Sequence, residues 1–471
     1  MFGRAVIGLL FFSGCTVGPN YQAPKINVAE QWATPLSHGE MKGAVDLSIW
    51  WKKFNDPDLD LLMTKAMESN YDLRLAQARV REARAQRDVA YGGLWPTIKT
   101  IASYSRNRWG KNSFPPLPPT TPFNFNEYNA GFDAAWEIDI FGGTRRAVEA
   151  ANAEVDAAQY GQRDVLISLL AEVARSYIQL RGFQQRLTIT HQNIKVQQET
   201  FDLTKSRFQH GLSSDLDVQE ARGILAQTQA QVPLLETGIQ ESVYHLAVLI
   251  GQEPEALMDE LSEEKSIPLT PPQVPVGLPS DLLQRRPDIQ KAERGLAAAT
   301  SHIGEAQSDL FPKFSLTGGG GIESLSTSNW FDYASRYGSI GPSVQWEIFE
   351  AGRIRAQVRV QNARQEEALD DYQQTILAAL QDVEGALTNY AKEQVRHQSL
   401  SESLDAQTQA LDLSTKLYKS GLVDFIRVLD SERALYLAQD ALVQSNQAVS
   451  VDLVQLYKAL GGGWSENLRK E

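Results

Sequence analysis

Apolar residues recur at every seventh position over two long stretches, and these stretches predict long helices. Starting after Gly143, the first series is Leu166, Val173, Leu180, Leu187, Ile194, Phe201 and Phe208. The second series is Ile376, Val383, Tyr390, His397, Leu404, Leu411 and Tyr418, in which His397 is the one exception. A strict seven-residue repeat is typical of helices that wind around their neighbours. A helix of about 65 residues would extend for about 100 Å.

Two shorter series begin after the pairs Gly211-Leu212 and Gly421-Leu422, and they predict return helices. Their apolar members are Val218, Leu225, Val232, Ile239 and Leu246, and Val428, Leu435, Leu442, Val449 and Leu456. The companion stripe, three residues later, is mostly small or polar, for example Ser242, Ser445 and Asp452. One apolar stripe beside one polar stripe favours a wide ring of helices with a wetted inner face. A solid helical bundle is the alternative.

Between the helical stretches, apolar and polar residues alternate with the period of a β-strand. Tyr128, Phe132 and Trp136 alternate with acidic or polar residues, and Val344 and Trp346 do so further along. Each segment follows another candidate strand, so we expect hairpins at about 97–140 and 313–349. Strands of about ten residues with one apolar face fit an outer-membrane β-barrel. A soluble sandwich would show the same alternation, and the glycine run 317–321 keeps the strand phase.

The chain is a tandem duplication with the same motifs in the same order. "WEIDIFGGTRRA" corresponds to "WEIFEAGRIRA", and "RFQHGLSSDLDV" to "LYKSGLVDFIRV". Each repeat is expected to hold a helix, a hairpin, a long helix (about 143–210 and 351–420) and a return helix (about 212–250 and 424–460). Asp56-Pro57 should begin the first helix as cap and first residue. We divide the chain into a signal peptide (1–14), an N-terminal lipidated segment (15–56), a first repeat (57–257), a linker (258–279), a second repeat (280–464) and a tail (465–471).

Charge and cysteine content narrow the class of protein. The net charge of −13 argues against nucleic-acid binding. Cys15 is the only cysteine, so the chain forms no internal disulfide. After the N-terminal segment, no apolar stretch has the length of a membrane helix, so a bilayer would have to be crossed by strands. Because four strands cannot close a barrel, we expect oligomers.

The N-terminus resembles a lipoprotein signal. Arg4 and the apolar run 5–12 precede Ser13-Gly14 and then Cys15, whose thiol would carry the lipid. Thr16 follows the cysteine, and the absence of Asp there favours the outer membrane. An incidental or buried cysteine is the alternative.

Catalytic and metal-binding motifs do not occur in the sequence. It contains no Walker loop, no G-x-S-x-G and no H-E-x-x-H, and its six histidines lack metal-ligand spacing. We therefore expect a protein that is not an enzyme and has no metal or cofactor besides the lipid on Cys15.

Several motifs resemble those of the outer-membrane factor family, the TolC-like, NodT-type lipoprotein channels of tripartite efflux pumps. The motifs are "GCTVGPNY", "WWKKFNDPDLDLLM", the segment 282–312 from "LLQRRPDIQ" to "DLFP", and "LYKALGGGW". The resemblance implies a mixed α/β membrane protein, a homotrimer with a twelve-stranded outer-membrane β-barrel continuous with a twelve-helix periplasmic α-barrel. It also implies a periplasmic adaptor and an inner-membrane pump, commonly of the resistance–nodulation–division type, in a Gram-negative bacterium.

The resemblance further places a narrow entrance just after the second tight turn, in "GLVDFIRVLDSERA". Ile426 and Asp430, four residues apart, share one helix face. Three copies would form one apolar and one anionic ring, which suits a dewetting gate and cation preference. Candidates for ion pairs that hold the closed state are Asp424, Arg427, Asp215, Asp217 and Glu220. Residues expected at adaptor-docking tips are Gly211, Leu212, Gly421, Leu422 and Val423.

The predicted function is passive export of small molecules through a channel that is gated at these tips. Two alternatives are a protein-secretion channel and a coiled-coil structural lipoprotein without a pore. The sequence specifies neither the exported compound nor the adaptor.

Overall fold

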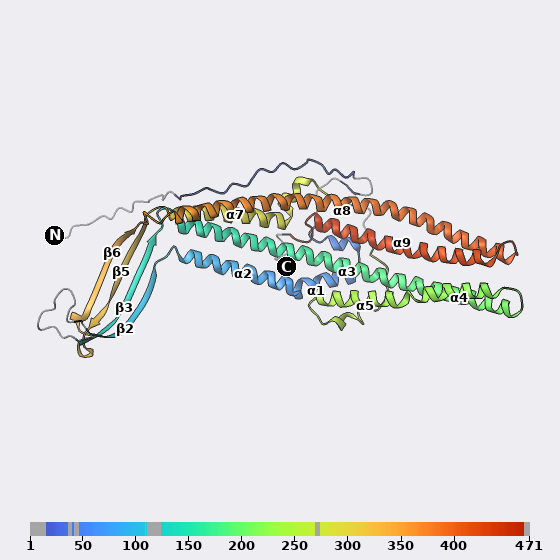
Figure 1. Ribbon diagram of the computed structural model, residues 1–471, viewed down its shortest axis with the longest axis horizontal. Coiled ribbons are helices and arrows are strands. Elements are labelled where there is room, and N and C mark those ends of the chain that lie inside the picture. The colour runs from blue at the N-terminus through green and yellow to red at the C-terminus, as the bar shows by residue number, and fades with distance from the viewer. Residues whose placement is uncertain are drawn as a thin grey trace. The chain divides into compact units, whose positions relative to one another are not determined.

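The computed structural model describes residues 16–35, 40–41, 47–108, 110, 124–268 and 274–465, which form two compact units (Figure 1). The sheet unit comprises residues up to Lys25, Val80–Ala158 and Ala292–Tyr372. The helical unit comprises Ile26–Arg79, Gln159–Lys291 and Gln373–Glu471. Each unit takes segments from both copies of the sequence repeat, so the repeats and the compact units divide the chain differently.

The elements follow the predicted alternation of helices and hairpins. The α-helices are α1 (Pro57–Ser69), α2 (Tyr71–Gly92), α3 (Gly143–Gln209), α4 (Asp215–Gln229), α5 (Val232–Leu249), α6 (Leu282–Arg285), α7 (Pro287–Ser308), α8 (Arg353–Lys419) and α9 (Phe425–Ala459). The strands are β1 (Glu40–Met41), β2 (Thr97–Arg108), β3 (Asn124–Ile138), β4 (Val274–Pro275), β5 (Lys313–Ser324) and β6 (Arg336–Gln345). In the described part of the chain, no helix is both long enough and apolar enough to pass through a membrane.

The sheet unit contains one four-stranded antiparallel sheet in the order β2-β3-β5-β6. Each hairpin comes from one repeat, and the pairing of β3 with β5 joins the two repeats. Strands β2 and β6 lie at the edges, where one side of each backbone has no partner within the sheet.

The two faces of this sheet differ as the alternation predicts. One face carries Ile98, Phe132, Trp136, Ile340 and Val344, all of which are exposed. The opposite face carries mostly polar residues, among them Lys99, Ser103, Glu127, Asp133, Ser315 and Ser343. A single copy of the chain thus leaves a broad apolar surface without cover.

The glycine run lies inside strand β5, as its phase predicts, and one member needs to be glycine. A Cβ on Gly321 would lie 2.3 Å from the carbonyl oxygen of Ala130 and 2.6 Å from the Cα of Gly131. Gly321 faces Gly131 across the β3–β5 pairing. The two repeats therefore approach closely at this point because both positions lack a side chain.

The N-terminal segment is fixed within the sheet unit by one arginine. Arg146, on α3, is buried; its Nε donates to Val17 O (3.1 Å) and its Nη2 to Asn20 Oδ1 (2.7 Å). Tyr21 packs against the alanines of α3 and α7 and donates to Glu293. The residues that follow Cys15 are thus bound to both repeats, whereas Cys15 itself and the predicted signal peptide lie outside the described residues.

Large aromatic side chains fill the core of the helical unit. Trp50, Tyr177, Tyr390 and Tyr457 are almost fully buried, and the rings of Trp50 and Tyr457 stack at 5.3 Å between centroids. Helix α1 begins as predicted, because the Asp56 carboxylate accepts hydrogen bonds from the backbone N–H groups of Asp58 and Leu59, both 3.0 Å.

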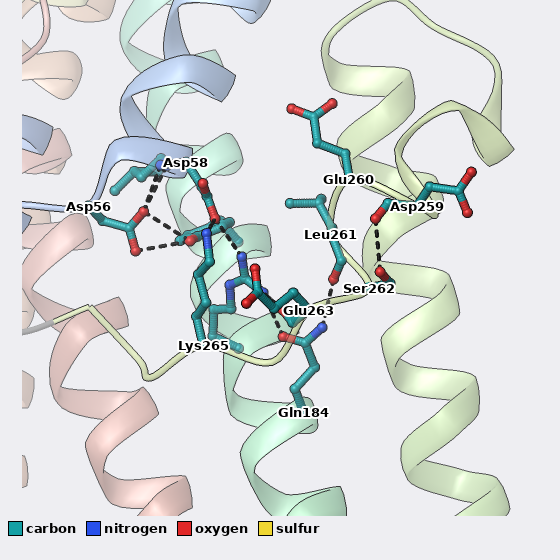
Figure 2. A network of polar contacts seen from close by, with 12 residues as sticks. Asp56, Asp58, Gln184, Asp259, Glu260, Leu261, Ser262, Glu263 and Lys265 are labelled. Carbon is teal, nitrogen blue, oxygen red and sulfur yellow. Dashed lines mark hydrogen bonds and ion pairs between the residues drawn. The ribbon is translucent and has the colours of Figure 1, made fainter.

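The predicted linker takes part in a polar network with α1 and α3 (Figure 2). Asp58 accepts from Arg181 Nη2 (2.8 Å) and from Lys265 Nζ (2.7 Å). Arg181, fully buried, also donates from Nη1 to Glu263 O (2.6 Å) and to Gln184 Oε1 (2.8 Å). Gln184 in turn donates to Leu261 O (2.8 Å). This network attaches the segment between the repeats to the long helix α3.

Several elements differ from the expectation. The single helix expected before each hairpin is two helices, since α1 and α2 are separated at Asn70, and α6 and α7 at Arg286. The first return helix is not one helix over 212–250 but two, α4 and α5, because Pro233 lies in the first turn of α5 and lacks an N–H for a continuous hydrogen-bond ladder. The second hairpin ends at Gln345 instead of 349. Its partner strand begins at Lys313, because Pro312 before it has no N–H to donate to the sheet. Trp346–Phe349 therefore lie beyond the last pair, Lys313–Gln345.

Candidate functional site

Each long helix ends in a tight turn that begins with a left-handed glycine. Gly211 has φ 71° and Gly421 has φ 73°. Leu212 N then donates to Arg207 O (2.8 Å), and Leu422 N donates to Leu417 O (3.0 Å). This is a glycine C-cap, in which a residue beyond the helix end satisfies a free carbonyl and reverses the chain. The two turns are called here the helical tips: the first tip is residues 208–218 and the second is residues 418–430.

The proposed gate residues lie on the exposed face of α9. Ile426 is 37 % exposed and Asp430 is exposed, whereas Phe425, Val428 and Leu429 are buried. Arg433 and Leu437 are exposed and continue the same face at helical spacing. Arg433 was not predicted as a site residue, although its position seven residues after Ile426 places it on the same helix face.

The buried face of the second tip packs on α3 and α4, the helices on either side of the first tip, and on α8. Phe425, Val428 and Leu429 form an apolar cluster with Ala221 of α4, and Phe201, Leu411 and Tyr418 pack against it. The rings of Tyr418 and Phe425 lie 5.2 Å apart between centroids, and the guanidinium of Arg207 lies 5.1 Å from the Tyr418 ring. This cluster buries one side of the start of α9 and leaves Ile426 and Asp430 on its exposed side.

The ion pairs of the described residues include none formed by Asp424, Arg427, Asp215, Asp217 or Glu220 within one copy of the chain. Asp217 instead forms a capping box with Ser214, in which Ser214 N donates to Asp217 Oδ2 at 2.9 Å. Asp215 accepts from Gln219 at 3.3 Å. Asp424 is the residue before α9, and its side chain forms no cap.

Of the residues predicted to meet an adaptor, Gly211, Leu212, Gly421 and Leu422 are exposed, and Val423 is half-buried. Leu212 is 67 % exposed and Leu422 is 72 % exposed. A groove of about 460 Å³ runs between α8 and α9 next to the second tip. Its lining includes Leu413, Leu417, Val423, Arg427 and Asp430. The tip thus combines protruding leucines with an open groove that holds both charges.

Polar contacts connect α3 to α9 along their length. Arg186 Nε donates to Asp440 Oδ1 at 2.6 Å, and Asn193 Nδ2 donates to Gln439 Oε1 at 2.9 Å. Closest to the tips, Thr200 Oγ1 donates to Glu432 Oε1 at 2.9 Å. We call this series of contacts the α3–α9 seam. It joins the helix that leads into the first tip to the helix that leaves the second.

Among the residues that the structure describes, no group of three or more His, Cys, Asp and Glu side chains could hold a metal ion. His191 and His210 are exposed, and His397, the exception in the heptad series, lies 2.6 Å from Asn446 Oδ1 through its Nε2. The polar member of the apolar stripe therefore has a polar partner on α9.

Comparison with known proteins identifies the family. A family model described as "Outer membrane efflux protein" matches residues 62–252 and 278–462. The pyoverdine export outer membrane protein OpmQ of Pseudomonas aeruginosa is 34 % identical over 426 residues, which cover 90 % of this chain and 89 % of OpmQ. The cation efflux system protein CusC of Escherichia coli O6:H1 is 30 % identical, with 97 % of both chains covered.

A solved structure supports the same assignment. The outer-membrane channel OprN superimposes with a TM-score of 0.89 and 36 % identity, covering 96 % of this chain and 100 % of that one. The agreement extends over both units, and it favours the channel over a coiled-coil tether. This chain therefore belongs to the outer membrane efflux protein family, whose members are passive channels of tripartite efflux systems and not enzymes.

Proposed function

We propose that three copies of the chain form a twelve-stranded β-barrel in the outer membrane and a twelve-helix α-barrel in the periplasm. The observation that carries this proposal is the sheet with an exposed apolar face and two unpaired edges, β2 and β6. Three such sheets of four strands give twelve strands, an even number within the range of outer-membrane barrels. Identical copies around one axis close the ring without a free edge.

The internal repeat suggests how the edges pair. Thr97 corresponds to Lys313 and Ala135 to Gln345, and the two pairs Thr97–Ala135 and Lys313–Gln345 occupy equivalent places in their hairpins. The repeats join through Ala134 opposite Gly318. By the same correspondence, the next junction places Val344 of one copy opposite Ala102 of the next copy, and Ser343 opposite Ser103. This register keeps all apolar side chains on one face.

Cross-linking of engineered cysteines tests this closure. Neighbouring pairs in an antiparallel sheet alternate between two geometries, so both Val344→Cys with Ala102→Cys and Ser343→Cys with Ser103→Cys are used. Oxidation of membranes should give a ladder that ends at the trimer for at least one pair. The matched control is Val344→Cys with Tyr104→Cys, shifted by two residues. Cross-links only in the control, or a ladder that ends at another number, would contradict the proposal.

We infer a gate at the second tip. Three copies of Ile426 would form an apolar ring and three of Asp430 an anionic ring at the periplasmic entrance, which favours cations and excludes water when narrow. Both side chains are exposed within one copy, which supports an inward position in the trimer. Asp424, Arg427 and Glu220 remain candidates for ion pairs between copies, whereas Asp215 and Asp217 already have local partners.

We also propose that the turns at Gly211-Leu212 and Gly421-Val423 dock the periplasmic adaptor. The exposed leucines and the groove beside the second tip support this placement. The inner-membrane pump would be of the resistance–nodulation–division type, and the cargo would be small molecules such as drugs or other toxic compounds. OpmQ is named for pyoverdine export and CusC for cation efflux, so relatives of this chain serve different small cargoes.

Lipid attachment at Cys15 is a separate proposal that rests on the sequence motif. The fixed position of Thr16–Tyr21 on Arg146 supports it, because an anchor is useful only where the chain that carries it is held. Intact-mass measurement of the purified protein tests it: the mature chain should begin at Cys15 and carry added acyl mass. In Cys15→Ser that mass should be absent. An unmodified chain that still contains residues 1–14 would contradict the proposal.

A further inference from the structure

Glu432 is a buried carboxylic acid next to the second tip, and only one of its oxygens has a partner. The residue is 7 % exposed and lies on the buried side of α9, one turn after Val428 and Leu429. Oε1 accepts the hydrogen bond from Thr200 of α3, whereas Oε2 is buried without a partner. Elsewhere in the α3–α9 seam, Asp440 receives both Nε and Nη2 of Arg186. The seam is therefore least satisfied at the position nearest the gate.

The charged side chains around Glu432 do not neutralise it. Its own helix carries Asp430 and Arg433 on the opposite, exposed face. On α8, Lys416 pairs with Asp412 at 2.6 Å. On α4, Asp217 belongs to the capping box and Glu220 adds another negative charge. The charged residues of α3 near Thr200 are Glu199, Asp202, Lys205 and Arg207. The first three are exposed, and Arg207 is half-buried against the Tyr418 ring.

A carboxylate in such a place disfavours the packed state. An ionised group removed from water without a counter-charge costs free energy, which is avoided either by binding a proton or by exposing the group. Burial accordingly raises the pKa of the Glu432 carboxyl above its usual range, and the hydrogen bond from Thr200 opposes that change. Exposure of Glu432 requires α9 to move away from α3.

We propose that Glu432 makes the packing of α9 on α3 at the helical tips dependent on protons, so that acid holds the tips together and neutral or alkaline medium loosens them. If the tips form the gate, as in the proposed function, the channel entrance would open more readily as the periplasm becomes less acidic. This consequence rests on that proposed function. The packing itself is a property of the chain and does not depend on conduction.

The sign follows from linkage between proton binding and packing. Because the packed tip holds the proton more tightly than the opened tip, protonation stabilises packing. This contribution is fully present below the ordinary carboxyl pKa of 4.5 and is lost as the pH rises through the raised value. Each unit of difference between the two states changes the packing equilibrium about tenfold.

Hydrogen exchange of the full-length purified protein tests the proposal. Protection factors, which correct for the intrinsic effect of pH, are measured at pH 5 and pH 8 for peptides that cover 198–208 and 425–435. In the unsubstituted protein, protection of both segments should be lower at pH 8 than at pH 5. In Glu432→Gln, which keeps the shape without the charge, protection should stay high at both values. Glu199→Gln, with the same change at an exposed position of α3, should respond to pH like the unsubstituted protein.

Two results would overturn the proposal: protection that does not change with pH in the unsubstituted protein, or an equal pH response in Glu432→Gln. Thr200→Val offers a second variant, because loss of the hydrogen bond should enlarge the pH response. Single-channel currents over the same pH range separate this proposal from the gate. A pH-dependent tip with pH-independent conduction would leave the Glu432 inference in place and reject the gate.

Discussion

The helical unit contains two buried charged side chains on its long helices, Arg181 and Glu432. The two differ in how many hydrogen-bond and charged partners they have. Arg181 donates through both of its terminal nitrogens to a carboxylate, a side-chain amide and a backbone carbonyl, and thereby ties α3 to α1 and to the linker. Its Nε is buried without a partner, but the guanidinium has a carboxylate beside it. Glu432 receives one hydroxyl and leaves an oxygen buried and unpaired. Both residues lie in helices with the same seven-residue periodicity, so helix type does not explain the difference.

This difference predicts that the region around Arg181 stays packed and that the region around Glu432 opens more easily. A buried charge with several partners is costly to displace, because separation would leave it unpaired. A buried charge with few partners gains solvation when the structure opens. The region around Arg181 should therefore remain packed while the tips separate, which gives the helices a fixed support for motion at their ends.

Removal of the Arg181 charge should have the largest effect on stability. We expect Arg181→Met to lower the free energy of unfolding by about 3 kcal/mol or more, because Asp58 and the backbone carbonyl of Glu263 lose a buried partner. Denaturation monitored by circular dichroism measures the change. Lys265→Met, which removes the more exposed cation on the same Asp58, is the matched control and should have a small effect. Equal effects of the two variants would remove the basis of the comparison.

Glu432→Met should change stability with the opposite sign. Since methionine needs no partner and fills similar volume, we expect the tips to gain about 1 kcal/mol at pH 8. Local protection from hydrogen exchange in 425–435 reports this gain better than global unfolding does. If protection of 425–435 falls in Glu432→Met, then the Glu432 carboxylate stabilises the packed tip. In that case Glu432 and Arg181 act in the same direction, and the contrast between the two regions is wrong.

The smallest expected effect concerns the turn at the second tip. Gly421→Ala should weaken tip protection by about 1 kcal/mol, because alanine disfavours the left-handed conformation with φ 73°. Gly223→Ala is the control, since Gly223 lies inside α4 with open space around it and alanine favours helix there. The control should raise protection slightly. If protection falls in Gly223→Ala, or does not fall in Gly421→Ala, the left-handed conformation of Gly421 does not determine the stability of the tip.

The periodic features of the sequence anticipated the elements well. The heptads predicted α3, α8 and α9, and the alternation predicted β2, β3, β5 and β6, because burial on one side of an element repeats at the period of that element. The break between α4 and α5 was readable from Pro233 but was not predicted. The contacts of Arg181 could not be read, because its partners Asp58 and Glu263 are distant in the sequence and follow no period.

The second tip was predicted only in part, because its local geometry is visible in the sequence and its long-range contacts are not. Glycine and spacing located the turns and placed Ile426 and Asp430 on one face, since both depend on local geometry alone. Glu432 was missed, although its position four residues after Val428 puts it on the buried side of α9. A charged residue at a buried position is a signal for sequence reading, but the lack of a partner for Oε2 requires the packing of α3 on α9.

The most direct test of the gate is the current through single channels in planar bilayers. The unsubstituted protein is compared with Ile426→Gly and Asp430→Ala, and Leu203→Gly on the exposed side of α3 and Asp412→Ala on α8 are the matched controls. We predict a small, cation-preferring current that rises in Ile426→Gly, loses cation preference in Asp430→Ala and is unchanged in the controls. Folded, inserted protein whose current is the same in all five forms would contradict a gate at the second helical tip.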